Sequence, residues 1–317
     1  MNAGHFVSSV LVTGGAGFIG SHLTDELLRQ GQRTIVLDDL SSGHLDNLPD
    51  HPLLEFERGD IRDDVVLAKL ATKYEIHTVY HLAAIASVTR SIENPLWTHS
   101  VNTEGSLRLA LWAERSLPSL RRFVFASSAA VYGDVVPVPV SEEVAGRPDS
   151  PYGLEKAATE RYLDWLHRSR GFPSVSARFF NVYGPRQDPS SPYSGVLSLL
   201  AASAHAREGF VVDGDGEQTR DFIYVEDVVS GLRVLGEHAD ATGGVFNVGT
   251  GAETSINDVV RTVQRLAGGG LVIRHGPPRQ GDIRHSKASA SKLRELGWTS
   301  TWSIQDGLRS LLRSHRT

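Results

Sequence analysis

The sequence predicts an α/β protein whose first domain is a doubly wound parallel sheet, followed by a smaller C-terminal α/β lobe. In the first half of the chain, short and nearly continuous apolar runs alternate with segments of helical periodicity, as in a parallel sheet covered on both faces. A glycine-rich turn directly follows the first apolar run, and beyond residue 180 the alternation becomes irregular. We therefore expect a first domain over residues 1–179, to which about 224–250 return, and a second lobe over residues 180–317.

The apolar runs of the first half are expected to be strands, at residues 7–13, 34–38, 53–56, 78–82, 123–127 and 174–179. Helical periodicity predicts helices at residues 18–30, 63–73, 95–117 and 152–169. In the first helix, Leu23, Leu27 and Leu28 share one face and Gly31 marks the end. Beyond residue 180 we expect helices at 195–207, 225–235, 256–266, 288–296 and 303–312, and a short strand at 210–212. Residues 245–248 are apolar enough to add one more strand to the main sheet.

Composition and charge exclude several classes of partner. The chain has 317 residues, of which 32 are Lys or Arg and 37 are Asp or Glu, so its formal net charge is -5. Such a chain is a poor candidate for nucleic-acid binding, which depends on neutralising phosphates. No apolar run approaches the ~18 residues of a bilayer span, and the N-terminal apolar stretch has no basic region before it, unlike a signal peptide. We expect a cytoplasmic protein without nucleic-acid or membrane partners.

The sequence offers no metal site and no hydrolase nucleophile. It contains no cysteine, which excludes disulfides, thiol catalysis and cysteine-ligated metals. Neither a His-Glu-x-x-His motif nor a Gly-x-Ser-x-Gly elbow is present. His77 and His81 are four residues apart on a predicted strand, which would separate them by roughly 13 Å. We therefore expect these two histidines to be packing or edge residues.

The turn after the first predicted strand fits a dinucleotide-binding fingerprint. Its residues are Gly14, Gly17 and Gly20, with Phe18 and Ile19 at the start of the helix. Glycines let the backbone approach a pyrophosphate closely, and the helix N-terminus adds free N–H groups and the positive end of its dipole. Asp38 ends the second strand, where an acidic side chain binds the adenosine ribose and repels a 2′-phosphate. The combination predicts a Rossmann-type domain that binds NAD rather than NADP.

A tyrosine and a lysine are spaced for acid–base chemistry. Tyr152 and Lys156 are four residues apart near the start of a predicted helix and so share one face. A free tyrosine has a pKa of about 10, and both a lysine cation and a positively charged nicotinamide would favour the phenolate. Such a phenolate could take a proton from a substrate hydroxyl while hydride leaves the same carbon. Ser127 and Ser128 end the preceding strand, and either could hydrogen-bond that hydroxyl.

Together these motifs resemble the extended short-chain dehydrogenase/reductases, and among them the NAD-dependent nucleotide-sugar epimerases. The resemblance covers nearly the whole chain, through the segments 13–20, 59–62, 81–84, 87–95, 127–133, 151–156, 178–186, 219–227 and 281–286 together with Asn102. It implies a base at Tyr152, a ribose-holding lysine at Lys156 and a second hydroxyl partner at Ser128. For the cofactor it implies adenine contacts at Asp60 and Ile61, lining residues Leu82, Ala83 and Ala84, support from Asn102, and Phe180 on the nicotinamide side.

The same resemblance implies a UDP-sugar substrate. The residues implied in gripping its diphosphate and uridine are Asn181, Arg220, Arg279 and Asp282. Guanidinium groups are bidentate phosphate ligands, which agrees with the two arginines. Further substrate-binding residues implied by the resemblance are Ser87, Ser127, Ser128, Gly195, Val196 and Ser286.

The reaction and the sugar follow from departures within the family. Dehydratases of the family carry an acidic pair where this chain has Ala129 and Ala130, which leaves reversible hydride transfer at one carbon and thus 4-epimerisation. Ser286 stands where members restricted to plain hexoses tend to carry a tyrosine, so UDP-GlcNAc and UDP-GalNAc are the expected pair, with UDP-Glc and UDP-Gal as a further pair. The alternatives are a pocket for hexoses or a uronate only, a UDP-glucuronate 4-epimerase, a 4,6-dehydratase with displaced acids, and an NAD-binding regulator on the same fold.

Two predicted helices carry apolar groups beyond those needed for one sheet. Residues 101–113 and 154–166 include Trp112, Tyr162 and Trp165. In the family that the chain resembles, the equivalent helices pair across a dimer, so a homodimer is expected. The alternative, that these helices only cover the sheet, stays open.

Overall fold

The computed structural model describes residues 8–134, 138–188, 195–278 and 283–314. The chain forms two compact units. Unit 1 comprises residues 1–131, 148–178 and 232–246, and unit 2 comprises residues 132–147, 179–231 and 247–317. The chain therefore passes from one unit to the other several times.

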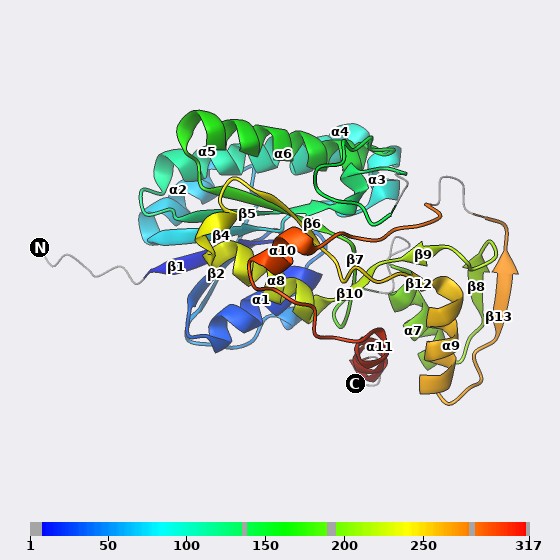
Figure 1. Cartoon of the computed structure of the whole chain (residues 1–317). Helices are drawn as coiled ribbons and strands as arrows, with labels where there is room; N and C mark the ends of the chain where they lie inside the picture. The colour runs from blue at the N-terminus through cyan, green and yellow to red at the C-terminus, as the bar shows by residue number, and fades with distance from the viewer. Residues whose placement is uncertain (1–7, 135–137, 189–194, 279–282, 315–317) are drawn as a thin grey trace, which may run out of the picture. The chain divides into compact units, whose positions relative to one another are not determined.

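The main sheet has seven strands in the order β11-β6-β5-β4-β1-β2-β3 (Figure 1). These strands are β1 (Ser9–Thr13), β2 (Arg33–Asp38), β3 (Leu54–Arg58), β4 (Ile76–His81), β5 (Arg122–Ser128), β6 (Ser174–Phe179) and β11 (Val245–Val248). Strand β1 pairs in parallel with both β2 and β4, so the strand order reverses between β1 and β4. In open α/β sheets, ligands bind at the carboxyl ends of the strands at such a reversal.

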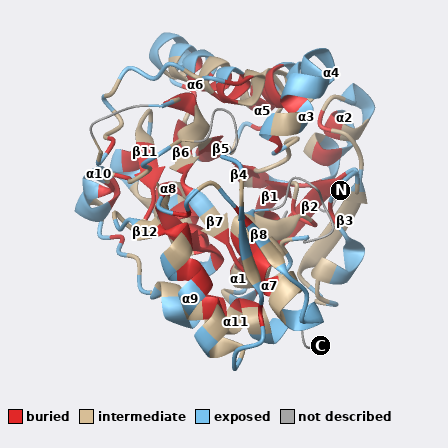
Figure 2. Cartoon of the chain, turned by 90° about the vertical axis from the view of Figure 1, so that its right-hand side faces the viewer, coloured by how far each residue is buried: buried red, intermediate tan, exposed pale blue. Residues whose placement is uncertain are grey.

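Helices cover both faces of this sheet. Helices α2 (Asp64–Lys73), α5 (Ser106–Ser116) and α6 (Pro151–Arg170) lie on one face, and α1 (Phe18–Arg29) lies on the other (Figure 1). Because both faces are covered, strands such as β1 are buried at every position (Figure 2). The predicted α/β fold with a parallel main sheet is confirmed, as is the addition of residues 245–248 to that sheet.

The predicted helix over residues 95–117 is not continuous. It consists of α4 (Pro95–His99), a π-helical turn (Ser100–Gly105) and α5, and it is preceded by α3 (Val88–Glu93), which the sequence did not predict. A π turn adds one residue to the helical repeat and is common at functional sites. Three short 3₁₀ segments complete the helical parts of unit 1: η1 (Leu45–Asn47), η3 (Ala129–Val131) and η4 (Ala239–Ala241).

Unit 2 is built from small sheets instead of one large sheet. Its pairs are β10 (Phe222–Tyr224) with β7 (Asn181–Tyr183), β12 (Thr254–Ser255) with β9 (Thr219–Arg220), and β13 (Ile273–Gly276) with β8 (Phe210–Asp213). Helices α7 (Val196–Ala206), α9 (Ile256–Leu266), α10 (Ser291–Glu295) and α11 (Ile304–Ser314) pack with them, and α8 (Val225–Glu237) begins in this unit and ends in unit 1. Most of these two- to four-residue strands were not predicted, and the helix expected over residues 288–296 begins only at Ser291.

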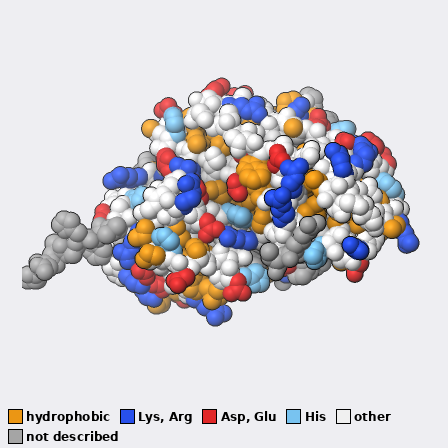
Figure 3. Space-filling view, turned by 90° about the horizontal axis from the view of Figure 1, so that it is seen from below, with side chains coloured by type: hydrophobic (Ala, Val, Ile, Leu, Met, Phe, Trp, Pro, Cys, Tyr) orange, Lys and Arg blue, Asp and Glu red, His pale blue; other side chains and the backbone are white. Residues whose placement is uncertain are grey.

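The surface shows no concentration of one charge on the face presented in Figure 3, where acidic and basic side chains are interspersed. None of the helices within the described ranges combines the length and apolarity that a bilayer span requires. In the same ranges, no three side chains of the metal-binding types come together.

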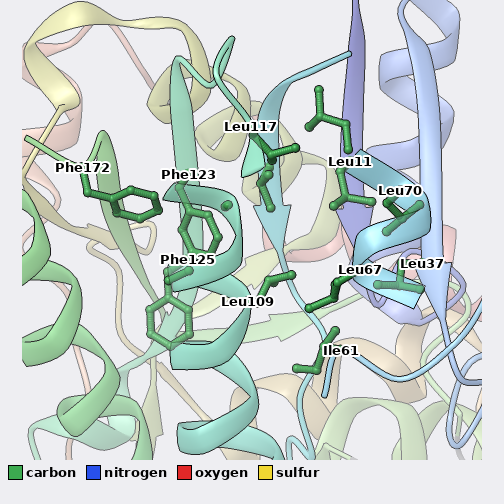
Figure 4. Close-up of a cluster of buried hydrophobic side chains, with 14 of the residues drawn as sticks. Leu11, Leu37, Ile61, Leu67, Leu70, Leu109, Leu117, Phe123, Phe125 and Phe172 are labelled. Carbon is green, nitrogen blue, oxygen red and sulfur yellow. The ribbon is translucent and has the colours of Figure 1, made fainter. Parts of the chain in front are cut away.

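One hydrophobic cluster fixes the strands that carry the site. Leu11 of β1, Leu67 of α2, Leu109 of α5, and Phe123 and Phe125 of β5 are all fully buried in it (Figure 4). Fully burying side chains of this kind contributes about 1.5–3 kcal/mol each. The cluster therefore holds the carboxyl ends of β1, β4 and β5 against the helices on this face.

Candidate active site

The glycine loop follows β1 and packs against the segment that follows β4. The Leu82 N–H donates to the Thr13 carbonyl oxygen (3.0 Å), and the Ala83 N–H donates to Thr13 Oγ1 (3.3 Å). Gly14 has φ +70°, and a Cβ placed on it would lie 2.7 Å from the Ala83 nitrogen. Because of this contact and this backbone conformation, position 14 requires glycine. The predicted cofactor segment 82–84 therefore lies directly beside the predicted cofactor loop.

The loop has the geometry that a pyrophosphate requires. A Cβ on Gly20 would overlap the Gly14 carbonyl oxygen, so Gly20 allows helix α1 to approach the loop. A Cβ on Gly17 would lie farther from the same Gly14 oxygen, at 3.2 Å, so Gly17 is less crowded than Gly20. Gly17 is the N-cap of α1, so the first N–H groups of the helix at Phe18 and Ile19 are directed out of the loop. These features fit the phosphates of a bound dinucleotide.

Asp38 lies at the end of β2 and binds the glycine loop. Its Oδ2 accepts a hydrogen bond from Ala16 N (3.0 Å) and its Oδ1 accepts one from Leu40 N (2.9 Å). Burial raises the pKa of this carboxyl above its usual value, and the two N–H donors act in the opposite direction. A carboxylate has about four acceptor sites, so these two bonds leave capacity for a ribose hydroxyl. The residue predicted to bind the ribose thus also fixes the loop.

The two residues implied for the adenine have different environments. Asp60 follows β3 and pairs with the Arg62 guanidinium at 2.5 Å, and this hydrogen bond holds the pKa of Asp60 below its usual value. The Ile61 side chain is buried in the hydrophobic cluster. Any contact of residue 61 with a cofactor therefore falls to its backbone.

His81 is the centre of a buried hydrogen-bonded chain. Its Nδ1 lies 2.8 Å from Thr13 Oγ1 and its Nε2 lies 2.8 Å from Ser106 Oγ. The Ser106 hydroxyl donates to the Asn102 carbonyl oxygen (2.6 Å), so it accepts from His81 Nε2–H. His81 Nδ1 is then unprotonated and accepts from the Thr13 hydroxyl, which in turn accepts from Ala83 N–H. The hydrogen bonds thus run from Ala83 N–H through Thr13, His81 and Ser106 to the Asn102 oxygen, and they fix the neutral tautomer with its proton on Nε2.

His81 is a packing residue, one of the two predicted options, because its ring centre lies 5.9 Å from that of Phe123 and 5.8 Å from that of Phe125. The side chain is 1% exposed and joins β1 to the helices on one face of the sheet. Burial, together with the charge of Lys156, lowers the pKa of His81 to about 3. The imidazole therefore stays neutral over the physiological range and keeps both hydrogen bonds.

The start of α6 places the predicted base. Ser150 is the N-cap and accepts from Gly153 N (3.2 Å), Pro151 occupies the first turn, and the Tyr152 N–H donates to Ser91 Oγ (3.0 Å). One turn later, Lys156 Nζ donates to the Ala126 carbonyl oxygen of β5 (2.7 Å). The same Nζ lies 5.8 Å from the centre of the Tyr152 ring and 4.7 Å from that of the Phe125 ring. The sheet edge and the helix thus hold the Tyr–Lys pair together.

The two candidate serines have different partners. The Ser128 hydroxyl is near enough to the Tyr152 phenol to lower its pKa. The Ser127 hydroxyl donates to Glu160 Oε1 (2.5 Å), and Glu160 Oε2 also accepts from Arg178 (2.7 Å). Ser128 therefore faces the predicted base, whereas Ser127 belongs to a buried ion pair beneath it.

The protein alone does not ionise the phenol. Burial raises the pKa of Tyr152 to about 12, the Ser128 hydroxyl lowers it, and the nearby Glu155 carboxylate raises it further. Burial lowers the pKa of Lys156 to about 8, partly offset by Glu155 and Glu160. The expected effect of the lysine cation on Tyr152 is therefore smaller than that of burial. Sequence reasoning missed Glu155, whose position one residue before Lys156 was the available signal.

Two further residues of the predicted set in unit 1 bind the backbone. Asn102 is fully buried in the π turn, and its Oδ1 accepts from Ile85 N (2.8 Å). Ser87 is the N-cap of α3, where its Oγ accepts from Arg90 N (3.1 Å). Both residues therefore shape the segment between β4 and α3.

Unit 2 carries the predicted nucleotide-binding residues. Arg220 Nη1 donates to the carbonyl oxygens of Thr219 (2.7 Å) and Ile283 (2.6 Å), and the Ser286 N–H donates to the Thr219 oxygen (3.2 Å). The structure thus places Arg220 and Ser286 in one neighbourhood. Arg279 and Asp282 lie outside the described residues.

The remaining predicted residues of unit 2 lie on separate elements. Phe180 is 7% exposed and its ring centre lies 6.4 Å from that of Tyr132. Asn181 is exposed at the start of β7, and Gly195 is the N-cap of α7, which begins at Val196.

Asp221 is a buried carboxylate to which the sequence assigned no role. Its Oδ1 accepts from the N–H (2.8 Å) and hydroxyl (2.6 Å) of Thr250, and its Oδ2 accepts from Gly251 N (2.8 Å) and Ala288 N (3.0 Å). It connects β9 to two segments distant in sequence. The position of Arg220, its neighbour in the chain, depends on these bonds.

A parallel sheet with a glycine loop at its point of reversal and a Tyr–Lys pair beside a serine defines a dinucleotide-dependent enzyme of the dehydrogenase/reductase type. Residues 10–249 match the NAD dependent epimerase/dehydratase family, and the chain belongs to that family. It is therefore an enzyme of the epimerase family that uses NAD.

Known proteins of similar sequence and structure agree with this assignment. The UDP-glucose 4-epimerase of Mycolicibacterium smegmatis is 37% identical over 311 residues, which cover 96% of this chain and 98% of that protein. The UDP-glucose 4-epimerase of Thermotoga maritima, solved with UDP-glucose, has a TM-score of 0.92 and 36% identity, covering 97% of this chain and 98% of that one. The UDP-N-acetylglucosamine 4-epimerase of Methanobrevibacter ruminantium, in complex with UDP-N-acetylmuramic acid, has a TM-score of 0.91 and 35% identity with the same coverage.

Proposed function

We propose that the protein is a UDP-sugar 4-epimerase in which Tyr152 is the acid–base residue. The observation that carries this proposal is the position of the Tyr152 phenol, near enough to the Ser128 hydroxyl for its pKa to be lowered by it, beside Lys156 and within the unit that holds the glycine loop. Ala129 and Ala130 stand where family dehydratases have their acids, which favours epimerisation over elimination. The similar proteins named above act on UDP-glucose or UDP-N-acetylglucosamine, according to their names.

In this proposal, Tyr152 removes the proton of the sugar 4-hydroxyl and later returns it to the 4-oxygen, when hydride comes back to the opposite face of C4. Ser128 holds the hydroxyl toward the phenol, and Lys156 binds the nicotinamide ribose from the position fixed by Ala126. Bound NAD would supply a reversible hydride acceptor for C4. Because the pKa of Tyr152 is about 12 in the protein alone, the base depends on a nearby positive charge to lower it. The 4-keto sugar turns about its diphosphate linkage between the two half-reactions.

We propose that the NAD phosphates lie over the glycine loop and that unit 2 grips the UDP moiety. Phe18 and Ile19 at the N-terminus of α1 provide the N–H groups for the phosphates, and Asp38 provides the acceptor for the ribose. In unit 2, Arg220 is held by two backbone carbonyls, which orients its guanidinium for a phosphate. Arg279 and Asp282 complete the proposed set.

For the sugar, we propose UDP-GlcNAc and UDP-GalNAc as the main pair, with UDP-Glc and UDP-Gal as a further pair. Ser286 is small and half-buried, and its backbone binds Thr219 next to Arg220. A small side chain at this position leaves volume for a 2-acetamido group. Similar proteins of both specificities support the pair of substrates.

Incubating the purified protein separately with UDP-GlcNAc, UDP-Glc and UDP-glucuronate, and resolving the products, tests the proposal. We expect the 4-epimers of the first two sugars. A stable keto-deoxy product would instead identify a dehydratase, and a 4-epimer of the glucuronate alone would identify a uronate epimerase. If no sugar is converted, the enzymatic proposal is wrong.

We also propose that the protein is a homodimer. Leu154, Tyr162 and Trp165 on α6 are 56%, 43% and 43% exposed, and Leu96 and Trp97 on α4 are 85% and 40% exposed. Trp112, by contrast, packs against the hydrophobic cluster. Large apolar groups exposed on neighbouring helices are typical of an interface. A monomeric mass by light scattering would contradict the dimer.

A further inference from the structure

Glu155 is a buried carboxylate next to Lys156 in the sequence, and the reaction described above gives it no role. Glu155 is 3% exposed and precedes Lys156 on α6. Its Oε1 accepts from Thr98 Oγ1 (2.7 Å) and its Oε2 accepts from Asn102 Nδ2 (2.6 Å). Both donors come from the helical segment that contains the π turn. A buried carboxylate is costly unless its bonds and charge are used.

The bond to Glu155 determines how the Asn102 amide is oriented. Because a carboxylate only accepts hydrogen bonds, it must face the NH₂ group of Asn102. The amide oxygen is then directed to Ile85 N (2.8 Å), and Nδ2 also donates to the Ile85 carbonyl oxygen (3.2 Å). Ile85 follows the cofactor segment 82–84 directly. Glu155 thus connects the helix that carries the base to the loop that lines the cofactor.

Glu155 and Glu160, both buried carboxylates on α6, have different partners. Glu160 pairs with the Arg178 guanidinium of β6, whereas both oxygens of Glu155 accept from neutral groups. Around Lys156, the ionisable groups are Glu155, Glu160 and Tyr152 on its own helix, and His81 on β4. The negative charge of Glu155 raises the pKa of both Lys156 and Tyr152.

We propose that Glu155 is a positioning residue that orients Asn102 and the adjoining cofactor loop, and whose charge balances Lys156 beside the base. The charge of Glu155 favours one ionisation of the Tyr–Lys pair and disfavours the other. It keeps Lys156 protonated, and it opposes ionisation of Tyr152. Its effect on turnover rests on the proposed epimerase function, whereas its effect on the two ionisations does not.

Glu155→Gln separates the charge from the hydrogen bonds. The glutamine oxygen can accept from Asn102, and its NH₂ can donate to Thr98 Oγ1, whose single proton then turns to the Pro95 oxygen 3.3 Å away. Without the negative charge, the pKa values of Tyr152 and Lys156 both fall, so we expect the pH profile of kcat to move as a whole by about one unit toward lower pH. Thr98→Val is the matched control, since it removes one bond to Glu155 and no charge. Its profile is expected to keep the wild-type pH dependence.

A second readout does not require turnover. The near-ultraviolet absorbance of the phenolate is titrated in the NAD-loaded protein, and the same titration of a Tyr152→Phe variant in each background is subtracted. We expect the Tyr152 transition of Glu155→Gln at lower pH than that of the wild type. If the folded variant keeps the wild-type transition, the proposed role of the charge is wrong. If the transition moves but the wild type converts no UDP-sugar, the epimerase proposal alone fails.

Glu155→Ala tests the orienting role. It removes the carboxylate that accepts from the buried Asn102 amide and from the Thr98 hydroxyl, so the Asn102 amide and the loop at Ile85 are less well held. We expect the NAD dissociation constant to rise roughly tenfold in Glu155→Ala and to change little in Glu155→Gln. Equal NAD affinity of the alanine variant and the wild type would overturn the orienting role.

Discussion

Unit 1 and unit 2 hold their proposed functional residues in different ways. In unit 1 the residues stand at the carboxyl ends of long parallel strands, and the sheet and its helices fix several loops at once. In unit 2 the strands are only two to four residues long, and single buried carboxylates join the segments. Asp221 joins β9 to residues 250 and 288, and Asp227 accepts from Thr301 N (2.8 Å) and Trp302 N (3.1 Å). In unit 2 a single carboxylate thus holds segments in place, whereas in unit 1 many residues of the sheet and its helices do so together.

The largest expected effect tests the assignment of chemistry to unit 1. Tyr152→Phe removes only the phenol oxygen, while the glycine loop and Lys156 remain. Loss of a general acid–base group lowers rates by about 10²–10⁴-fold, so we expect kcat to fall to this extent with NAD affinity unchanged. Steady-state kinetics and calorimetric NAD titration measure the two quantities. Unchanged turnover would remove Tyr152 from the mechanism.

The next prediction tests the importance of a single carboxylate in unit 2. Asp221→Ala leaves the buried N–H of Ala288, the half-buried N–H of Gly251 and both half-buried donors of Thr250 without an acceptor. Since each unpaired buried donor costs about 1–3 kcal/mol, we expect the free energy of unfolding to fall by about 3–5 kcal/mol. Urea denaturation measures this change. Asp215→Asn, which breaks the exposed pair with Arg284, is the control and should have little effect.

A smaller effect is expected for the choice of sugar in unit 2. Ser286→Tyr fills the volume proposed for the acetamido group, and overpacking of this kind costs about 1–3 kcal/mol. We expect kcat/KM for UDP-GlcNAc to fall about 10–100-fold relative to that for UDP-Glc. Ser286→Ala is the control and should keep the wild-type ratio. If the tyrosine variant keeps it too, residue 286 does not select the sugar.

The smallest effect concerns the polar chain in unit 1. The pKa of His81 is about 3 in the folded protein and about 6.5 when unfolded, so between these values the unfolded state binds one more proton. Stability from the neutral imidazole is complete above about pH 6.5 and is lost as the pH falls. Below pH 6 the unfolding free energy of the wild type should fall more steeply with decreasing pH than that of His81→Asn. The difference is expected to be up to about 1.4 kcal/mol per pH unit. Parallel slopes in urea denaturation from pH 5 to 7 would contradict this prediction.

The sequence predicts unit 1 well because its signals are local. Apolar runs, the glycine turn and the Tyr152–Lys156 spacing each lie within a few residues, and the structure brings Ser128 to Tyr152 as one of two predicted options. The π turn at residues 100–105 was missed because an inserted residue hardly changes apolar periodicity over 23 residues. Unit 2 was predicted less completely because strands as short as β9 contain too few residues to show a period.

The polar residues in the interior of unit 1 were missed for another reason. Glu155 and His81 have partners 53 and 25 residues away in the sequence, so no local pattern reveals the bonds. A detectable signal did exist, since both are polar residues on element faces that otherwise bury apolar groups. Such residues indicate a buried network, but its partners become known only in three dimensions.

The glycine loop described above is held by contacts within the chain. Thr13, Gly14 and Asp38 fix its backbone, so little further ordering would be needed when a dinucleotide binds. Ligands that meet such preorganised seats bind more tightly and depart more slowly. Slow departure suits a catalyst whose redox partner ends every cycle in its starting state, because nothing is gained by exchanging it.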